Sequence, residues 1–405
     1  MTSFLNWFLH RSVRHARQMS SHARKLVAAQ RDILTPQAVE NVEGSIKTLE
    51  ESTQGRVDGT VVMQRMADLE KIAIKWLKPY PNASYRENVE VLLVAIAVAM
   101  GIRTFFLQPF KIPTGSMQPT LFGVTAKNHL DDPNFKPPNA LVQWKDFLIS
   151  GTSYFHVVAH NAGVFSVVDY QPSRFLLFNL RQRFKIDDEV YTVWFPPENL
   201  WKHAGFFDGA YLERHPSYKV GDDIIKMQAT SGDHLFVDRM TYNFRRPARG
   251  DIVVFKTEGI RYPGMTDDQH YIKRLIGLSG ETVQIGNDRH VRINGVRLDA
   301  STAHFSKVYD EAHWRDAKSS VEKLWPEDGY MGHVNSQYRP LNMTFFNDEN
   351  FKFVVPPNQY LVMGDNTLNS SDSRYWGSFP SQNVIGKSFF VYWPFNVRFA
   401  WWGHD

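Results

Sequence analysis

The feature that most constrains this chain is the apolar run Val91–Ile102, which reads VLLVAIAVAMGI and contains no charged residue. Twelve residues alone would suit a helix buried in a soluble core. Extended to residues 89–110, the segment is long enough to cross ~30 Å of hydrocarbon, and Glu90 and Arg103 lie where their side chains can reach the polar interface. We therefore expect a single transmembrane helix at residues 89–110.

Basic residues are concentrated before this segment. The chain has 46 Lys and Arg against 42 Asp and Glu, and the resulting excess of +4 falls within residues 1–88. Basic flanks favour the cytoplasmic side of a membrane, so we expect a cytoplasmic N-terminus and an extracytoplasmic remainder. An excess this small gives no reason to expect a nucleic-acid partner.

Residues 1–88 are expected to form a cytoplasmic, helical and basic region. Thr35 followed by Pro36 is typical of an N-cap and the first helical position. The region is open to two interpretations, a helix lying on the membrane surface or a solvated helical hairpin. The first depends on basic residues among apolar ones, which are Phe4, Leu5, Trp7, Phe8, Arg11, Arg14, Arg17, Arg24 and Lys25.

Beyond the span, short β-like runs are separated by Gly, Pro and aromatic residues. Such runs without alternating helices favour a mainly β, antiparallel domain, which we place at residues 111–123 and 231–405. Residues 124–230 contain several Pro-rich breaks and are expected to form an inserted lobe. The predicted strands are Ile252–Phe255, Tyr271–Ile276, Thr282–Ile285, Val291–Ile293, Phe353–Val355, Tyr360–Met363 and Ser388–Tyr392.

The C-terminal run Phe389–Trp402 is strongly aromatic but contains Pro394 and Arg398. It is too short and broken for a second span. A final strand followed by an aromatic edge at the membrane interface fits it better, because Trp prefers sites that are apolar at one end and wet at the other.

The chain contains no cysteine, which excludes disulfides, thiol nucleophiles and Cys-ligated metal sites. We expect no metal and no other cofactor. A cation site built from Asp365, Asn366, Asn369 and Asp372 is conceivable, but it lacks the spacing and the terminal Glu of a calcium loop.

Three segments contain residues suited to catalysis. The first, Ile112–Leu121, reads IPTGSMQPTL and places Ser116 between two prolines that stiffen the chain. Such a segment can present a fixed hydroxyl at the rim of a sheet, although composition alone favours an ordinary linker turn between a membrane helix and a domain.

The second segment reads YIKRLIG and begins at Tyr271. In a strand, Tyr271, Lys273 and Leu275 share one face, so Lys273 would point into a packed region. Burial lowers the pKa of an amine and lets it act as a base near neutral pH. The alternative is a lysine on an edge strand that reaches to water.

The third segment, Gly364–Gly377, reads GDNTLNSSDSRYWG and is dense in short hydrogen-bonding side chains. Such a loop satisfies its own backbone and can anchor neighbouring groups. Asp372 and Arg374 are expected to form an ion pair that helps to hold it.

Together these segments resemble the bacterial type I signal peptidases, or leader peptidases, which are membrane-bound serine proteases that remove signal peptides from exported proteins. The resemblance covers most of residues 85–395, and five motifs occur in the order of the family. They are the basic-then-apolar anchor, PTGSMQPTL, the run Arg249–Phe255, YIKRLIG and GDNTLNSSDSRYWG. The resemblance implies a β catalytic domain of signal-peptidase type that needs no cofactor.

By position, the resemblance implies a Ser/Lys dyad in which Ser116 is the nucleophile and Lys273 the general base. The Ser116 N–H and the Thr114 hydroxyl would form the oxyanion hole. The residues that would support the dyad are Ser370, as a hydrogen-bond partner of Lys273, and the pair Asp372 and Arg374. The residues that would build shallow pockets for small side chains are Ile112, Pro113, Met117, Tyr271 and Ile272.

The resemblance also implies partners and a location. We expect signal peptides of secreted preproteins as substrates, a lipid bilayer, contact with the protein-export machinery, and a single pass through the bacterial inner membrane. The chain departs from the family at residues 124–230, because the family runs almost directly from the serine segment into the next strand. Two alternatives remain, a membrane-tethered β scaffold with an inactive dyad and a self-cleaving repressor, although a repressor would have a DNA-binding domain instead of a span.

Overall fold

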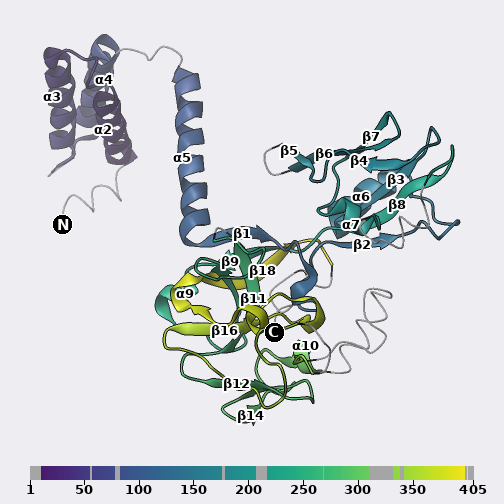
Figure 1. Ribbon diagram of the computed structural model, residues 1–405. Coiled ribbons are helices and arrows are strands. Elements are labelled where there is room, and N and C mark those ends of the chain that lie inside the picture. The colour runs from purple at the N-terminus through teal and green to yellow at the C-terminus, as the bar shows by residue number, and fades with distance from the viewer. Residues whose placement is uncertain are drawn as a thin grey trace. The chain divides into compact units, whose positions relative to one another are not determined.

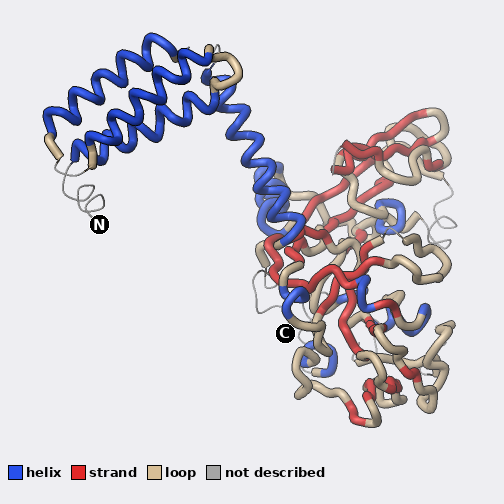
Figure 2. Tube along the Cα trace, turned by 90° about the vertical axis from the view of Figure 1, so that its left-hand side faces the viewer, coloured by secondary structure: helices blue, strands red, loops and turns tan. Residues whose placement is uncertain are grey.

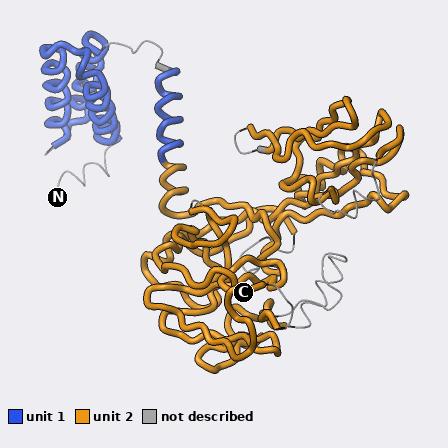
Figure 3. The backbone as a smooth tube through the Cα atoms, viewed as in Figure 1, with its two compact units in different colours: residues 1–97 blue, residues 98–405 orange. Residues whose placement is uncertain are grey.

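The computed structural model describes residues 11–54, 57–77, 83–175, 178–206, 217–267, 269–310, 332–337, 342–396 and 399. The chain divides into two compact units, Met1–Ala97 and Val98–Asp405, and each is described here by itself (Figure 3). The apolar residues between Phe4 and Phe8, on which the surface-helix interpretation depends, lie outside the described residues.

The first unit contains helices α2 (Arg11–Ala29), α3 (Pro36–Ser52) and α4 (Gly59–Trp76), which lie side by side (Figures 1 and 2). Thr35 caps α3 as predicted, because its side chain accepts a hydrogen bond from the Ala38 N–H. Apolar residues recur every three or four positions along the helices and form a common core. The three helices thus share one core, and the choice between the two interpretations of residues 1–88 stays a prediction.

Helix α5 (Ala83–Phe105) includes the candidate membrane span, Ser84–Phe105, of which no part is buried. The predicted span 89–110 overlaps this helix up to Phe105, and its C-terminal bound is wrong for a helix. Residues 107–110 belong to strand β1 (Leu107–Lys111), whose backbone pairs antiparallel with β9 (His234–Asp238). At its N-terminal end, the helix continues through polar residues to Ala83, because residues outside the apolar stretch also have the propensity to form a helix.

A seven-stranded antiparallel sheet forms the centre of the second unit, in the order β1-β9-β18-β10-β11-β16-β17. A smaller sheet has the order β14-β13-β12-β15. Each predicted strand overlaps an observed one. The remaining bounds are β10 Ile252–Lys256, β11 His270–Gly277, β12 Thr282–Ile285, β13 Val291–Ile293, β14 Val296–Arg297, β15 Phe353–Val354, β16 Gln359–Met363, β17 Phe379–Pro380 and β18 Val384–Trp393.

The central sheet is covered on both faces. On β10, Val253 and Phe255 pack into one apolar cluster while Ile252 and Val254 pack into another, as the alternation of a strand requires. Short helical turns lie in the connections, at η1 Gly115–Met117, α9 Thr241–Phe244, α10 Ser306–Tyr309, η2 Thr367–Asn369, α12 Ser373–Trp376 and η3 Ser381–Asn383. Three of these turns, η1, η2 and α12, lie within the predicted catalytic segments.

Residues 124–230 have their own sheets and their own core. One sheet has the order β2-β8-β3, and β6 pairs with β4, β5 and β7 in the other. Phe184, Trp201 and Met227 are among the buried residues of the core. The bounds are β2 Thr125–Asn128, α6 Ala140–Ser150, β3 Thr152–Val158, β4 Phe165–Val167, β5 Ser173–Phe175, β6 Phe178–Ile186, β7 Glu189–Trp194, α7 Leu200–His203 and β8 Asp223–Thr230.

Candidate active site

Ser116 lies in the turn η1, just after strand β1, and its side chain is buried. The loop after β16 holds this turn, because Asn366 donates from its backbone N to the Ser116 carbonyl and from Nδ2 to the Gly115 carbonyl, both at 3.0 Å. Gly364 makes the approach possible, since a Cβ at that position would lie 2.5 Å from the Ser116 carbonyl oxygen. The first and third catalytic segments therefore form one structure.

Lys273 lies in β11, between β10 and β16, and is 4% exposed. Its Nζ donates to Ser116 Oγ at 2.7 Å and to the Ile272 carbonyl at 3.1 Å. The two residues of the predicted dyad are 157 positions apart in the sequence and form a buried hydrogen bond. The alternative of a solvent-reaching lysine on an edge strand is therefore wrong.

Burial lowers the pKa of Lys273 from its ordinary value of 10.5 to about 8. The negative charges of Asp372 and Asp365 oppose this shift, and the positive charge of Arg374 adds to it. Desolvation is the largest contribution, so the amine loses its proton far more readily than a lysine in water. A neutral amine at 2.7 Å from a hydroxyl can accept the hydroxyl proton.

Asp372 and Arg374 form the predicted ion pair, with both side chains fully buried. The contact is bidentate, from Arg374 Nε and Nη2 to the two carboxylate oxygens, at 2.8 Å each. Asp372 also accepts from the Gly364 N–H, and Arg374 donates to the Thr367 carbonyl and hydroxyl. Burial would raise the pKa of Asp372, but the Arg374 charge and these hydrogen bonds outweigh it and hold the pKa below its ordinary value.

Two further predicted groups lie beside the dyad. The Thr114 hydroxyl is 3.5 Å from Ser116 Oγ, on the same turn. Ser370 is buried, but the hydrogen bond that we expected from it to Lys273 is not formed, because the contacts of the amine are to Ser116 and the Ile272 carbonyl. The Ser370 hydroxyl lies instead beside Asp372, whose ionised form it favours.

Three of the five predicted pocket residues, Ile112, Met117 and Ile272, pack in one apolar cluster. Tyr271 belongs to the neighbouring cluster, and its ring centroid is 5.5 Å from Lys273 Nζ. Pro113 is exposed, while Met117 is fully buried. The Tyr271 ring is thus one apolar neighbour of the buried amine.

Sequence reasoning missed a second buried ion pair. Arg274 donates from Nε and Nη2 to the two oxygens of Asp365 at 2.7 Å each, and neither side chain is exposed. Thr120 joins the pair by donating to Asp365 at 2.6 Å. The signal was an Arg beside Lys273 on a buried strand together with an Asp two residues after the end of β16, the strand that pairs with it. Asp365 is thus occupied by Arg274, and no cluster suited to a metal ion occurs among the described residues.

The two ends of the inserted lobe meet beside the serine segment. The Asp233 carboxylate accepts from the Phe122 N–H at 2.7 Å, and the Asp233 carbonyl accepts from the Ile112 N–H at 2.9 Å. Gly232 approaches so closely that a Cβ there would lie 1.8 Å from the Ile112 carbonyl oxygen. The insertion point is therefore built into the predicted substrate-binding region.

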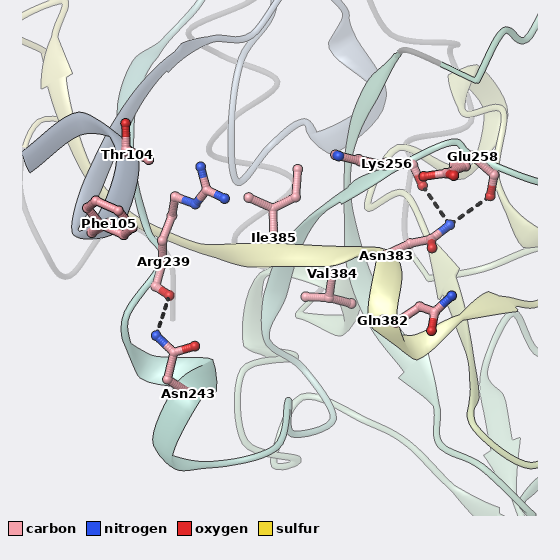
Figure 4. A pocket seen from close by; sticks show the side chains of 10 residues that line it. All are labelled: Thr104, Phe105, Arg239, Asn243, Lys256, Glu258, Gln382, Asn383, Val384 and Ile385. Atoms are coloured by element: carbon pink, nitrogen blue, oxygen red, sulfur yellow. Dashed lines mark hydrogen bonds between the residues drawn. The ribbon is translucent and has the colours of Figure 1, made fainter. Parts of the chain in front are cut away.

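A cavity of about 540 Å³ lies elsewhere, where α5 ends (Figure 4). Its lining is mostly polar. Asn383, one of the lining residues, donates hydrogen bonds to the carbonyls of Lys256 and Glu258. None of the predicted site residues lines it. Its lining consists of Thr104, Phe105, Arg239, Asn243, Lys256, Glu258, Gln382, Asn383, Val384 and Ile385.

Comparison with known proteins gives a consistent result. The sequence model of the family described as signal peptidase, peptidase S26, matches residues 85–126 and 218–393. Signal peptidase I of Aquifex aeolicus is 33% identical over 187 residues, a match that covers 41% of this chain and 71% of that protein. Signal peptidase I S of Bacillus subtilis is 33% identical over 180 residues, covering 44% and 77%.

Among solved structures, a signal peptidase I from Enterococcus faecalis is 28% identical and has a TM-score of 0.23, with 35% of this chain and 97% of that chain covered. The family match contains every predicted site residue. It omits residues 127–217, which lie inside the inserted lobe.

Proposed function

This chain belongs to the signal peptidase family, peptidase S26, and on that premise we propose that its endopeptidase chemistry is performed by Ser116 and Lys273. The observation that carries the proposal is the buried hydrogen bond of 2.7 Å between Lys273 Nζ and Ser116 Oγ. Family membership decides against the repressor alternative. The inactive-scaffold alternative is the one that experiment must test.

In the proposed mechanism, Lys273 starts as the neutral amine. It accepts the proton of Ser116 while Oγ attacks the carbonyl carbon of the scissile peptide bond. The oxyanion that forms is stabilised by the Ser116 N–H and the Thr114 hydroxyl. The ammonium of Lys273 then protonates the leaving amine, and the acyl group remains on Ser116.

Deacylation repeats these proton transfers with water. The neutral Lys273 removes a proton from a water molecule, which attacks the acyl ester and releases Ser116 and the carboxylate of the cleaved signal peptide. Asp372, Arg374 and Ser370 are positioning residues, because they hold the loop on which η1 rests. Ile112, Pro113, Met117, Tyr271 and Ile272 would form or support pockets that accept only small side chains before the cleaved bond.

The proposal includes an arrangement in the membrane. Residues 1–88 are cytoplasmic, α5 spans the bacterial inner membrane, and residues 111–123 and 231–405 form the extracytoplasmic catalytic domain, with 124–230 as an inserted lobe. The exposed apolar surface of α5 and the basic residues before it support this topology. Signal peptides of preproteins are the substrates, and the export machinery that delivers them is a neighbour.

The experiment compares substitutions in the detergent-solubilised full chain, incubated with a preprotein whose cleavage position is read by mass. Ser116→Ala and Lys273→Ala should each lower kcat/KM by at least about 10³-fold, because the first variant lacks the nucleophile and the second lacks the base. Lys352→Ala and Ser279→Ala, which alter exposed residues of the same two types, should cleave like the parent chain. Retained cleavage by either dyad variant, with the cut at the same bond, would refute the assignment.

A further inference from the structure

Helix α6 of the inserted lobe has its apolar side chains on the outside. None of its residues is buried. Six large apolar residues are exposed, by 40 to 80%: Leu141, Val142, Trp144, Phe147, Leu148 and Ile149. In a water-soluble domain, the apolar face of such a helix would be expected to pack against the core.

The face of α6 that turns toward the lobe is polar. Asp146 accepts a hydrogen bond of 2.8 Å from the Tyr154 hydroxyl on β3, and Gln143 donates to the Pro138 carbonyl at 2.7 Å. Ser150 donates to the Asp146 carbonyl and to Thr152. These polar groups hold the helix in place with its apolar residues outward, so the exposure follows from a specific set of contacts. The outward surface is suited to an environment that is not water.

The end of α6 is attached to the sheet that follows the membrane span. Trp393, at the end of β18, donates from Nε1 to the Leu148 carbonyl at 2.8 Å, and its ring packs edge-on against Phe147. The Phe395 N–H donates to the Ile149 carbonyl at 2.7 Å, and the Phe395 side chain is 55% exposed. Phe395 thus adds to the exposed apolar surface of α6.

The strand register relates this surface to the span. Trp393 pairs with His234, and His234 pairs with Lys111 at the far end of β1. Since β1 begins two residues after α5 ends, the Trp393 end of β18 lies roughly 17 Å from the end of the span along the strand direction, the length of one five-residue strand, and two strands across the sheet. The end of α6 is therefore joined through the central sheet to the residues that follow the span.

We propose that α6 lies in the interface of the bilayer that α5 spans, with its apolar face toward the acyl chains, and that it docks the inserted lobe on the membrane. The composition fits this occupant, because Trp and aliphatic residues face outward and Lys145 is the charged residue among them. The proposal depends on α5 being a span and is independent of the dyad chemistry.

The test uses the absence of cysteine from the chain, since a single introduced Cys accepts a nitroxide label at one position. The label is placed at Leu141→Cys on α6 or, as the matched control, at Val296→Cys on β14, where Val296 is 70% exposed. The full chain is reconstituted in vesicles of phosphatidylcholine and phosphatidylglycerol, at less than one protein per vesicle. The measured quantity is the accessibility of the label to lipid-dissolved oxygen and to a water-soluble nickel chelate.

At position 141 we expect high accessibility to oxygen and low accessibility to nickel, at a depth of about 5–10 Å below the lipid phosphates. At position 296 we expect the reverse. Equal exposure of both labels to nickel would overturn the proposal. Protection of position 141 from both reagents would also overturn it, because protein rather than lipid would then cover the helix.

A charge-insertion variant separates membrane contact from a merely structural effect. Trp144→Glu with Leu148→Glu, added to the Leu141→Cys chain, should return the label to water while the unfolding temperature stays unchanged. Val296→Glu with Val354→Glu, at residues 70% and 62% exposed, should leave the label in lipid. A label that remains in lipid in the first variant would contradict the proposal. Because no readout here is proteolysis, a failure of the proposed enzymatic function would not imitate any of these outcomes.

Discussion

The catalytic β domain and the inserted lobe depart from the usual distribution of polarity in opposite ways. In the β domain, the charged groups of Lys273, Arg274 and Arg374 are buried. In the lobe, the apolar residues of α6 are exposed while its polar residues face the protein. Either arrangement is unfavourable unless something compensates for it.

The compensation differs between the two regions. Each buried arginine has a bidentate carboxylate partner within the domain, so the charges are satisfied by the chain itself. Among the described residues Lys273 makes no ion pair, and burial lowers the pKa of its amine to about 8, so the amine gives up its proton more readily than an ordinary lysine. The apolar side chains of α6 are exposed and are not covered by other residues of the helix, so we expect an apolar environment outside the protein to cover them.

The largest expected effect breaks the compensation in the catalytic domain. Asp365→Ala leaves the Arg274 guanidinium buried without its partner, so the free energy of unfolding should fall by about 3–5 kcal/mol. Leu141→Ala, at an exposed position of α6, should change it by less than about 0.5 kcal/mol. Urea unfolding of the solubilised chain, followed by hydrogen exchange in β11 and β16, measures both. If both variants lose a similar free energy of unfolding, the contrast between the compensated buried charges of the β domain and the exposed residues of α6 would be wrong.

A second substitution should act in the opposite direction. Lys273→Met removes the amine whose pKa is lowered from 10.5 to about 8, so the folded chain should gain on the order of 3 kcal/mol in stability below pH 8 while losing activity. The gain should diminish as the pH rises from 8 toward 10.5, since the unfolded chain then also loses the proton. Thermal unfolding midpoints of both chains at pH 7 and pH 10 measure this dependence. A variant less stable than the parent at both pH values would show that Lys273 is not desolvated.

Thr114 is an exposed residue whose hydroxyl lies 3.5 Å from the buried hydroxyl of Ser116, the proposed nucleophile. Thr114→Val keeps the shape and removes the hydroxyl, so kcat should fall by about 10²-fold with little change in KM. Thr114→Ser should restore most of the rate. If Val and Ser variants are equally active, the hydroxyl does not stabilise the oxyanion.

Much of the catalytic site could be predicted from the sequence because its groups lie in continuous motifs. The alternation of β11 places Lys273 toward the interior, and the pair Asp372 and Arg374 are close enough in sequence to meet within one turn. Each predicted run of strand residues overlaps a strand because its β-branched and aromatic residues pack on a sheet.

Other features depend on contacts that no local pattern encodes. The pair of Arg274 and Asp365 follows from the pairing of β11 with β16, which brings together residues 91 positions apart. The end of α5 at Phe105 is set by the pairing of β1 with β9, so hydropathy alone misplaced it. The outward orientation of the apolar side of α6 was not predicted either. The spacing of apolar residues shows that a helix has an apolar and a polar side, but it does not show which side faces the core.

The central claim is that the environment of Lys273 lowers the pKa of its amine enough to make it a base. The most direct measurement is the pH dependence of kcat/KM for cleavage of a preprotein, since the ascending limb of this profile reports the ionisation of the general base in the free enzyme. The account predicts that activity rises with an apparent pKa of about 8, as the amine loses its proton. A rise centred near the ordinary lysine value of 10.5 would contradict it.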